Sequence, residues 1–596
     1  METKFEVGWD LSPIFTSPED PKIDETLKLA HSLVLEIELF RGKINSSDMT
    51  PVKLKELLDQ VGEVSSIYME VYGYANLVTS VNQENKPGII LRNKAMVALN
   101  KTRQKTAFVT IELGDLLADR GEEFLHSPLL SNYKHYLEKV QRAHDYRLSE
   151  TEEQLIIEKN LYGISEWSKL QQQWLSTRKF VVQGKEVGWS EGRGLFTHNN
   201  HAVRREALTT LKGGLKRDQE VYASALRSIC GDHVADSKRR GYKDPLEPAL
   251  VANDISQEML ANMFEVIGAN VHLYQRFLKL KARMMGTGDR LRGEDLEAPL
   301  PSDNGGSSIS WEQTKTWMVD TYGSFDPELG SIVENMFDRN RIDASPRPTK
   351  VAGAFCSTWY RGKTTYVLQS FTNTMDDALT LAHELGHAVH GHLASQSQVF
   401  LSHRAPMVLA ETASEFGRML FVEKVLSEAK AQTKRNVLFK SLEEIVMAIF
   451  EVGTRFHFEA DLYATIEQGG YLDGDKITEL FQKAREKYFG ESIDWLPEQF
   501  YQWCWKPHYY MPNFRFYNFP YVFAELIVLA LYNSYRQEGE AFVPRYKAFL
   551  ATGNAKSPEE MVHELGFDLA DKKFWEMGFV EIERLLDELE EIERSR

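Results

Sequence analysis

Long amphipathic helical patterns constrain the fold of this chain more than any other feature of its sequence. From about residue 24 to residue 175 they continue with almost no glycine or proline between them. Within 51–72, apolar side chains recur at helical spacing, namely Leu54, Leu57, Leu58, Val61 and Val64. Helical periodicity resumes near residue 201 and runs almost to the C-terminal end, and no repeat of fixed length is present. The sequence therefore predicts a mainly α protein.

Two short segments interrupt the helical pattern with β-prone residues. The first, 179–189, has two such runs around a turn at 183–185, which predicts a hairpin. The second, 351–371, has two runs on either side of residues 361–363. It predicts a pair of strands just before the segment that contains the clearest chemical motif.

The hairpin also marks a predicted domain boundary. With 596 residues, the chain is long enough for several domain-sized units. We place one boundary just after the hairpin, which gives an N-terminal helical domain at 1–200 and a second domain at 201–596. Within the second domain, 286–308 contains many turn-forming residues and few apolar ones, which predicts a long loop.

Composition narrows the expected partners and compartment. The chain has 70 Lys and Arg against 87 Asp and Glu, a net charge of −17, which repels phosphate backbones and anionic lipids. We therefore expect neither nucleic acid nor a membrane as a partner. The three cysteines, a small and odd number, fit a reducing compartment. The N-terminus lacks the apolar core of a signal peptide, and the longest apolar stretch, 526–532, is far shorter than the roughly 20 residues that span a bilayer. We expect a cytoplasmic protein.

The segment 383–387 (HELGH) is the most informative part of the sequence. His383 and His387 are four residues apart, so on a helix they lie roughly 6 Å apart along one side, and both imidazoles can reach one cation. Glu384, the residue after His383, is near enough to touch a metal-bound water and need not bind the metal itself. Gly386 costs about 1 kcal/mol in a helix compared with alanine, and close approach of a neighbouring backbone would explain it. The spacing predicts a metal site beside a carboxylate that does not bind the metal.

A catalytic zinc site uses three protein ligands, so a third is needed. Glu411 interrupts an apolar run in 406–425, where a buried carboxylate needs a partner. Metal ligation and an ordinary salt bridge are both open for it on spacing alone. Glu415, one turn later, could accept a hydrogen bond from the second nitrogen of a histidine ligand. We expect His390 to have a supporting or packing role, and His403 to be solvated in a connecting loop.

The motif at 383–387, followed by 408–415 (VLAETASE), resembles the zinc site of the thimet oligopeptidase and oligoendopeptidase F family. Four other segments are similar to this family: 9–15 (WDLSPIF), 353–355 (GAF), 507–510 (PHYY) and 516–521 (FYNFPY). The chain departs from the family pattern at 518–520, where Asn, Phe and Pro replace the usual Val, Tyr and a polar residue. In this family the glutamate of the second motif is the third zinc ligand, and that position is Glu411 here.

The resemblance implies a role for each site residue. It implies one zinc ion per chain, held by the two histidines and the glutamate of the two motifs, with Glu384 as the general base. It also points to His508, Tyr510, Tyr517 and Tyr521 as hydrogen-bond donors to the oxygen that becomes negative during attack on the peptide bond. For each tyrosine, packing in an aromatic core is the open alternative.

The resemblance also implies a fold and an activity. The expected fold is a large helical two-part structure with a deep substrate channel and a small β-sheet beside the helix that carries the HExxH motif. The expected activity is zinc-dependent hydrolysis of internal bonds in short, unfolded oligopeptides. The predicted strand at 364–371 would pair with an extended substrate, because an open sheet edge offers unpaired N–H and C=O groups.

Two other functions stay open on the sequence alone. One is a zinc carboxypeptidase on a similar helical scaffold, in which Arg361 or Arg515 would bind the substrate carboxylate. The other is a non-catalytic helical binding protein in which the HExxH motif is accidental. Cleavage of amidated peptides separates the first from an endopeptidase, and metal analysis tests the second.

Overall fold

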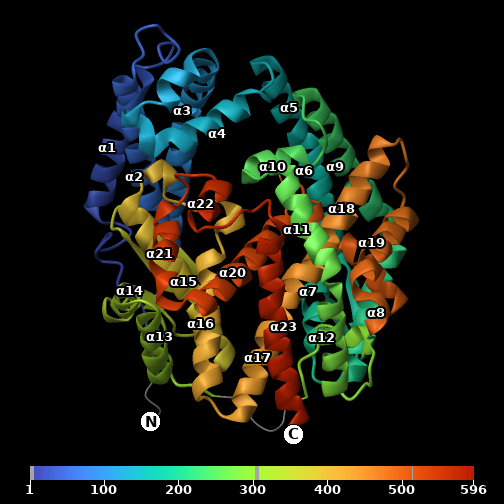
Figure 1. Cartoon of the computed structure of the whole chain (residues 1–596). Coiled ribbons are helices and arrows are strands. Elements are labelled where there is room, and N and C mark those ends of the chain that lie inside the picture. The colour runs from blue at the N-terminus through green and yellow to red at the C-terminus, as the bar shows by residue number, and fades with distance from the viewer. Residues whose placement is uncertain (1–5, 302–307, 513) are drawn as a thin grey trace. The chain divides into compact units, whose positions relative to one another are not determined.

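The computed structural model describes residues 6–301, 308–512 and 514–596, and most of these residues are helical (Figure 1). They form two compact units, each built from three segments of the chain. Unit 1 contains Met1–Asp145, Gly306–Val437 and Leu531–Leu569. Unit 2 contains Tyr146–Gly305, Leu438–Ala530 and Ala570–Arg596. The mainly α prediction is confirmed.

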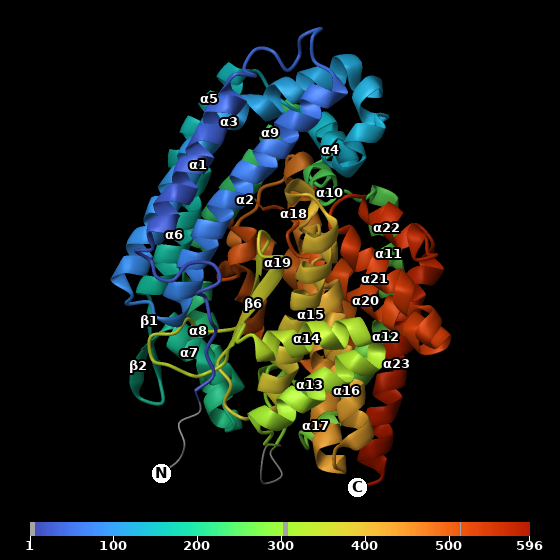
Figure 2. The ribbon, with the colours of Figure 1, turned by 90° about the vertical axis from the view of Figure 1, so that its left-hand side faces the viewer.

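Unit 1 begins with α1 (Pro21–Glu38), α2 (Pro51–Val81), α3 (Lys86–Leu125) and α4 (Lys134–His144). Figure 2 shows α1 and α2 side by side, and α2 also packs on α3. Each of the first three helices has a proline in its first turn after an N-cap that accepts a backbone hydrogen bond, at Asp20, Thr50 and Asn85. The apolar stripe predicted within 51–72 lies in their shared core.

The small sheet of unit 1 contains β4 (Ile342–Asp343), β5 (Phe355–Trp359) and β6 (Thr364–Leu368). Its order is β4-β6-β5, with β6 parallel to β4 and antiparallel to β5. The two strands predicted within 351–371 are confirmed. The predicted open edge at 364–371 is wrong, because β6 is paired on both sides. The two-residue strand β4 gives no sequence signal, and the edge strands are β4 and β5, of which β5 is the longer.

The sheet lies beside α15 (Met375–Ser397), which packs against both β5 and β6. Thr374 caps this helix in a reciprocal capping box with Asp377. α15 also packs against α16 (Thr412–Glu428) and α21 (Val543–Thr552). The remaining helices assigned to unit 1 are α13 (Trp311–Phe325), α14 (Pro327–Asp338) and α22 (Pro558–Glu564). This arrangement places the helix that carries the predicted metal motif between the sheet and other helices of unit 1, with the two motif histidines partly exposed.

Unit 2 contains the predicted hairpin, β1 (Lys179–Val182) and β2 (Lys185–Gly188), which pair antiparallel. Its turn residues Gln183 and Gly184 both have positive φ, as a two-residue turn between right-twisted strands requires. Within the predicted loop 286–308, Leu291–Arg292 forms β3 and pairs with β7 (Ile493–Asp494). Residues 302–307 of that loop lie outside the described residues.

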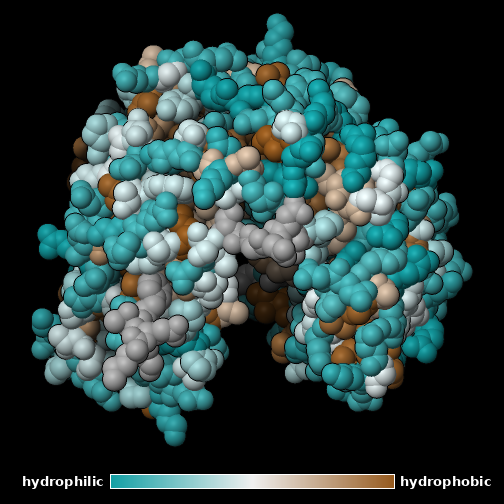
Figure 3. All heavy atoms as spheres, turned by 90° about the horizontal axis from the view of Figure 1, so that it is seen from below, coloured by the Kyte–Doolittle hydropathy of each residue, from teal (hydrophilic) through white to brown (hydrophobic). Residues whose placement is uncertain are grey.

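The other helices that lie wholly in unit 2 are α5 (Glu150–Tyr162), α6 (Ile164–Thr177), α7 (Trp189–Gly194), α8 (His201–Arg217), α9 (Gln219–Arg240), α10 (Glu247–Asn253), α11 (Gln257–Ala269), α12 (Val271–Met284), α18 (Val452–Glu467), α19 (Gly474–Phe489) and α23 (Lys572–Arg594). Two more, α17 (Ala431–Val446) and α20 (Phe519–Glu538), include residues of both units. On the face shown in Figure 3, hydrophilic residues predominate and hydrophobic ones are interspersed among them. Among the described residues, we find no helix with the length and apolar character needed to cross a bilayer.

Candidate metal centre

The HExxH motif lies in the middle of α15 and presents two imidazoles to one carboxylate. The rings of His383 and His387 are 4.9 Å apart and nearly perpendicular. Their Nε2 atoms lie 3.4 Å and 3.2 Å from Oε2 of Glu411. Within the described part of the chain, these three residues are the one group of three or more potential ligands whose atoms lie within 4.8 Å of one another. The three predicted ligands therefore converge on one point.

A close contact between α15 and α16 fixes this convergence. Glu411 occupies the N-cap position of α16, two residues after the end of a short 3-10 turn at Met407–Leu409. Two residues later, the backbone of Ala413 passes so close to Gly386 that an added Cβ would lie 2.2 Å from the Ala413 carbonyl oxygen. The expectation that Gly386 admits a neighbouring backbone is confirmed.

A second layer of side chains holds the candidate ligands in place. Nδ1 of His383 lies 3.0 Å from Oε1 of Glu415, the predicted partner. Nε of Arg418 donates a 2.6 Å hydrogen bond to the other oxygen of Glu415, and Nη2 of Arg418 forms an ion pair with the same oxygen at 2.6 Å. Burial would raise the pKa of the Glu415 carboxyl, but Arg418 and His383 outweigh burial and lower it to about 2. Ser414 donates a 2.9 Å hydrogen bond to Oε2 of Glu411.

Arg418 was not predicted from the sequence. Its signal was its position three residues after Glu415, which puts both side chains on one face of a helix. The pair forms a short chain of contacts from Arg418 through Glu415 to His383. Such outer contacts fix the orientation of a metal-binding imidazole and favour its ligating nitrogen.

Glu384 is different from the other carboxylates of this group. It is only 6% exposed, and among the described residues its Oε2 has no hydrogen-bond partner. Burial raises the pKa of its carboxyl, and His383 and His387 only partly offset this. A buried carboxylate with one oxygen unpaired retains the capacity to accept a proton.

The donor set fits a catalytic metal. Two imidazole nitrogens and one carboxylate oxygen are a ligand combination of catalytic zinc sites, which leave a further position open. Both carboxylates around the histidines are held by other side chains, Glu411 by Ser414 and Glu415 by Arg418. The residues present therefore match such an ion in type, number and support.

The predicted donors near the C-terminal end lie in unit 2 and have different surroundings. The rings of His508 and Tyr517 stack at 5.4 Å, and the Tyr521 hydroxyl donates a 3.1 Å hydrogen bond to the Tyr517 hydroxyl. Tyr521 is 39% exposed. Tyr510, in contrast, is fully buried with its hydroxyl against the backbone carbonyl of Tyr222. This placement of Tyr510 supports the alternative role in core packing.

The pKa of the His508 imidazole is lowered strongly. Burial lowers the pKa of its imidazole to about 4, and the cations Lys506 and Arg455 add to this shift. A histidine with such a pKa is neutral near pH 7, so it carries one N–H donor and one acceptor nitrogen. Donation of a hydrogen bond from His508 therefore needs no prior protonation.

Two further histidines were considered from the sequence. His390 is buried, and its Nε2 has no hydrogen-bond partner among the described residues. His403 was expected to be solvated, and this is wrong. It is 5% exposed, its Nδ1 lies 2.6 Å from the Phe400 carbonyl, and its ring contacts those of Tyr360 and Phe400. The 3-10 turn at Phe400–Ser402 folds the connecting segment back onto these aromatic rings.

Both arginines considered for a carboxypeptidase are engaged with other groups. Arg361 forms ion pairs with Glu63 and, at 3.4 Å, with Glu70. Arg515 is buried in unit 2 and donates a 2.7 Å hydrogen bond to the Tyr509 carbonyl. A substrate carboxylate would have to displace these contacts.

In comparisons with known proteins, the chain matches peptidases. The family model described as peptidase family M3 matches residues 314–581, and the model described as oligopeptidase F matches residues 112–180. The chain is 24% identical to oligopeptidase PepF of Bacillus subtilis, covering 99% of this chain and 88% of that protein. It is 22% identical to the plasmid oligoendopeptidase F of Lactococcus lactis subsp. cremoris, covering 98% and 97%.

Solved structures agree in fold. A Chlamydophila abortus protein described as a peptidase has a TM-score of 0.85 at 20% identity, covering 98% of both chains. Oligoendopeptidase F from Enterococcus faecium has a TM-score of 0.69 at 21% identity, covering 96% of this chain and 99% of that one. At such identities these likenesses establish the helical fold.

Proposed function

Because the chain belongs to peptidase family M3 and is a metalloendopeptidase, we propose that it uses zinc to hydrolyse internal bonds of short, unfolded oligopeptides. The observation that carries this proposal is the convergence of His383, His387 and Glu411 beside Glu384, whose Oε2 has no hydrogen-bond partner among the described residues. The family implies a metal, and these three residues would hold it, one ion per chain.

The chemistry divides between the ion and the side chains. Zinc, when bound, lowers the pKa of a coordinated water towards 7 and polarises the scissile carbonyl. Glu384 accepts the proton of the attacking water and passes it to the leaving amine. Glu415, held by Arg418, fixes the orientation of His383 and so the position of its Nε2.

The open edge of β5 supports the choice of an unfolded substrate. β5 pairs with β6 on one side only, and it packs against the helix that carries the motif. An extended peptide can add to such an edge through its own N–H and C=O groups. A folded segment whose backbone groups are already paired cannot do so. This edge replaces the one first predicted at 364–371.

His508, Tyr517 and Tyr521 are the donors that we propose for the oxygen of the scissile carbonyl. The neutral state of His508 and the mutual hydrogen bond of the tyrosines support this role. A donor of this kind contributes typically a few kcal/mol in the transition state. We leave Tyr510 out of this group because its hydroxyl is buried against a backbone carbonyl.

We also propose a cytoplasmic location. Cys230, Cys356 and Cys504 are all free thiols. Free cysteines are the usual state in a reducing compartment.

The experiment uses one decapeptide sequence with a blocked N-terminus in two forms, one with an amidated C-terminus and one with a free C-terminus. The purified protein should contain one zinc per chain and cut both forms at internal bonds. Glu384→Gln is the matched control, which should retain its zinc and lose at least about 100-fold in kcat. Release of single residues from free C-termini, with no cleavage of the amidated peptide, would instead identify a carboxypeptidase. Absence of stoichiometric zinc, with no cleavage of either peptide, would identify a binding protein.

A further inference from the structure

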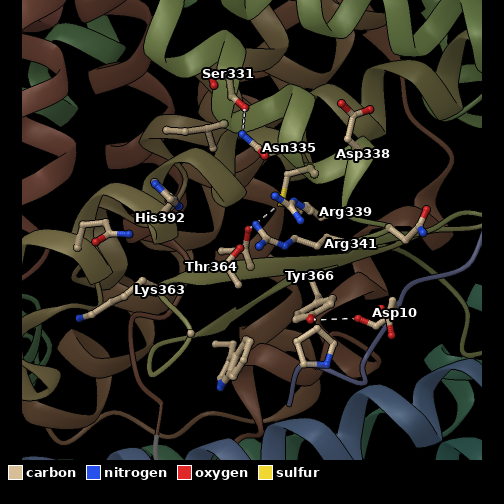
Figure 4. Close-up of a pocket in the computed structure, with 18 of the residues that line it drawn as sticks. Asp10, Ser331, Asn335, Asp338, Arg339, Arg341, Lys363, Thr364, Tyr366 and His392 are labelled. Carbon is tan, nitrogen blue, oxygen red and sulfur yellow. Dashed lines mark hydrogen bonds between the residues drawn. The ribbon is translucent and has the colours of Figure 1, made fainter. Parts of the chain in front are cut away.

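Unit 1 contains a cavity that the proposed peptidase chemistry does not use. Its volume is about 760 Å³, and it lies between the C-terminal part of α14, the start of β6 and the second half of α15 (Figure 4). None of the three candidate metal ligands lines it. Pockets for small organic ligands typically have volumes of about 300–1,000 Å³. The cavity is therefore large enough for a metabolite.

Two arginines are placed in this cavity by a rigid helix ending. Asn340, which separates Arg339 from Arg341, has a φ of 48°, in the left-handed region that asparagine tolerates. The N–H groups of Asn340 and Arg341 donate to the carbonyls of Phe337 and Met336, which is the Schellman pattern at the end of α14. The Arg341 carbonyl accepts a 2.9 Å hydrogen bond from β6. Both backbones are thus fixed before any ligand binds.

Figure 4 shows the two arginine side chains next to each other, beside Thr364 of β6. Among the described residues, neither guanidinium forms a hydrogen bond or an ion pair with an acidic side chain. Burial lowers the pKa of Arg341, and the positive charge of Arg339 adds to this shift. Arg341 is partly buried and Arg339 is exposed. Two cations held close together repel each other, and an anion between them would remove that repulsion.

The acidic residues of the cavity, Asp10, Glu328 and Asp338, form no ion pair with these arginines within the described part of the chain. Asp338 lies 3.0 Å from Lys315, Glu328 lies 2.5 Å from Lys547, and the Asp10 carboxylate accepts a 2.9 Å hydrogen bond from the Ser12 N–H. The helix ending does not need the arginines either, since backbone N–H groups already satisfy its last carbonyls. Neither an ion pair nor the stability of the helix ending therefore accounts for the positive charges of the two arginines.

We propose that this cavity binds a small organic molecule with at least two negative charges, anchored by the guanidinium groups of Arg339 and Arg341. Each guanidinium offers a planar fork of donors that matches a phosphate or a carboxylate. The volume exceeds what a single oxyanion needs, so the ligand also has an organic part. Neutral polar side chains such as Asn335 and Thr364 are available to bind that part.

The test is calorimetric titration of the zinc-loaded full chain at constant ionic strength. The probes are adenosine 5′-monophosphate and glycerol 3-phosphate for phosphate, and succinate for carboxylate, with uncharged adenosine as the blank. We expect saturable binding of at least one anionic probe and none of adenosine. Binding of the phosphates alone would identify a phosphate ester as the ligand, and binding of succinate alone would identify a dicarboxylate.

Variants locate the site. Arg339→Gln and Arg341→Gln should each weaken binding by about 10-fold or more, since each removes hydrogen bonds between charged groups. Arg103→Gln on α3 is the matched control, because it removes an exposed arginine of the same unit and does not touch the cavity. Arg339 is exposed, so its variant remains informative if Arg341→Gln lowers stability. Failure of every anionic probe to bind at millimolar concentration, or binding unchanged in Arg339→Gln, would overturn the proposal.

Discussion

The contact at Gly386 links the stability of unit 1 to the geometry of its metal ligands, and we expect Gly386→Ala to damage both. An added Cβ would lie 2.2 Å from the Ala413 carbonyl oxygen and 2.6 Å from Cα of Ser414. Real Cβ atoms essentially never have contacts below 3.0 Å. The two backbones would therefore have to separate by roughly 0.8 Å, the difference between 2.2 Å and 3.0 Å.

Two free-energy terms oppose each other in this variant. Alanine gains about 1 kcal/mol over glycine in a helix interior. Overpacking typically costs about 1–3 kcal/mol, and the upper part of this range applies when backbone must move rather than a flexible side chain. We expect a net loss of about 1–2 kcal/mol in the free energy of unfolding. Because ligand distances in a metal site hold to about 0.2 Å, the shift should also reduce zinc affinity.

Gly73 provides the matched control. It lies inside α2 of the same unit, and an added Cβ there would meet nothing within 4 Å. Urea unfolding should show Gly73→Ala more stable than wild type by about 0.5–1 kcal/mol and Gly386→Ala less stable. Chelator competition should show weaker zinc binding only for Gly386→Ala. If the two variants had equal stability and wild-type zinc affinity, the argument from backbone contact would be refuted.

Three further predictions address the side chains around the reaction. Arg418→Met should weaken zinc binding by about 10- to 100-fold in chelator competition, because the carboxylate that orients a histidine ligand loses its support; unchanged affinity would contradict this. Tyr521→Phe should lower kcat and kcat/KM together by about 100-fold, whereas Tyr510→Phe should leave both near normal in the same assay. Because burial lowers the pKa of His508 to about 4, its imidazole is neutral above about pH 5, and an acidic limb of kcat/KM above that pH should keep its position in His508→Asn. A displaced limb would assign that titration to His508.

The parts of the candidate site that the sequence predicted are those governed by local geometry. A helix with two histidines four residues apart presents them on one side whatever else the chain does, and α15 does so. Gly386 indicated a close approach of a neighbouring backbone, because glycine is unfavourable inside a helix unless such a contact requires it. Arg418 was equally local, three residues after Glu415, but arginine near glutamate is so common on helices that the pair gave no distinctive signal.

The parts that the sequence did not predict depend on contacts between distant segments. The order of the sheet was missed because β4 has only two residues, too few for alternating hydrophobicity to appear, and its pairing turned the expected edge strand into the central one. The division into two units also leaves no mark, since each unit combines three separate segments and α17 and α20 continue through the division without a break in helical pattern. The boundary near residue 200 stays a prediction about the sequence domains.

The two sites of unit 1 show which kind of site can be predicted from the sequence and which cannot. The metal ligands fall within two motifs that are each short, so their chemistry was visible before the fold was known. The residues 339–341 (RNR) look like an ordinary solvated helix ending, since cations near a helix C-terminus are favourable on their own. Only the packing of α14 beside β6 and α15 turns this ending into the wall of a cavity. A site formed by a motif is recognisable from the sequence, whereas a site formed by packing is recognisable only when the charges left without partners can be examined in three dimensions.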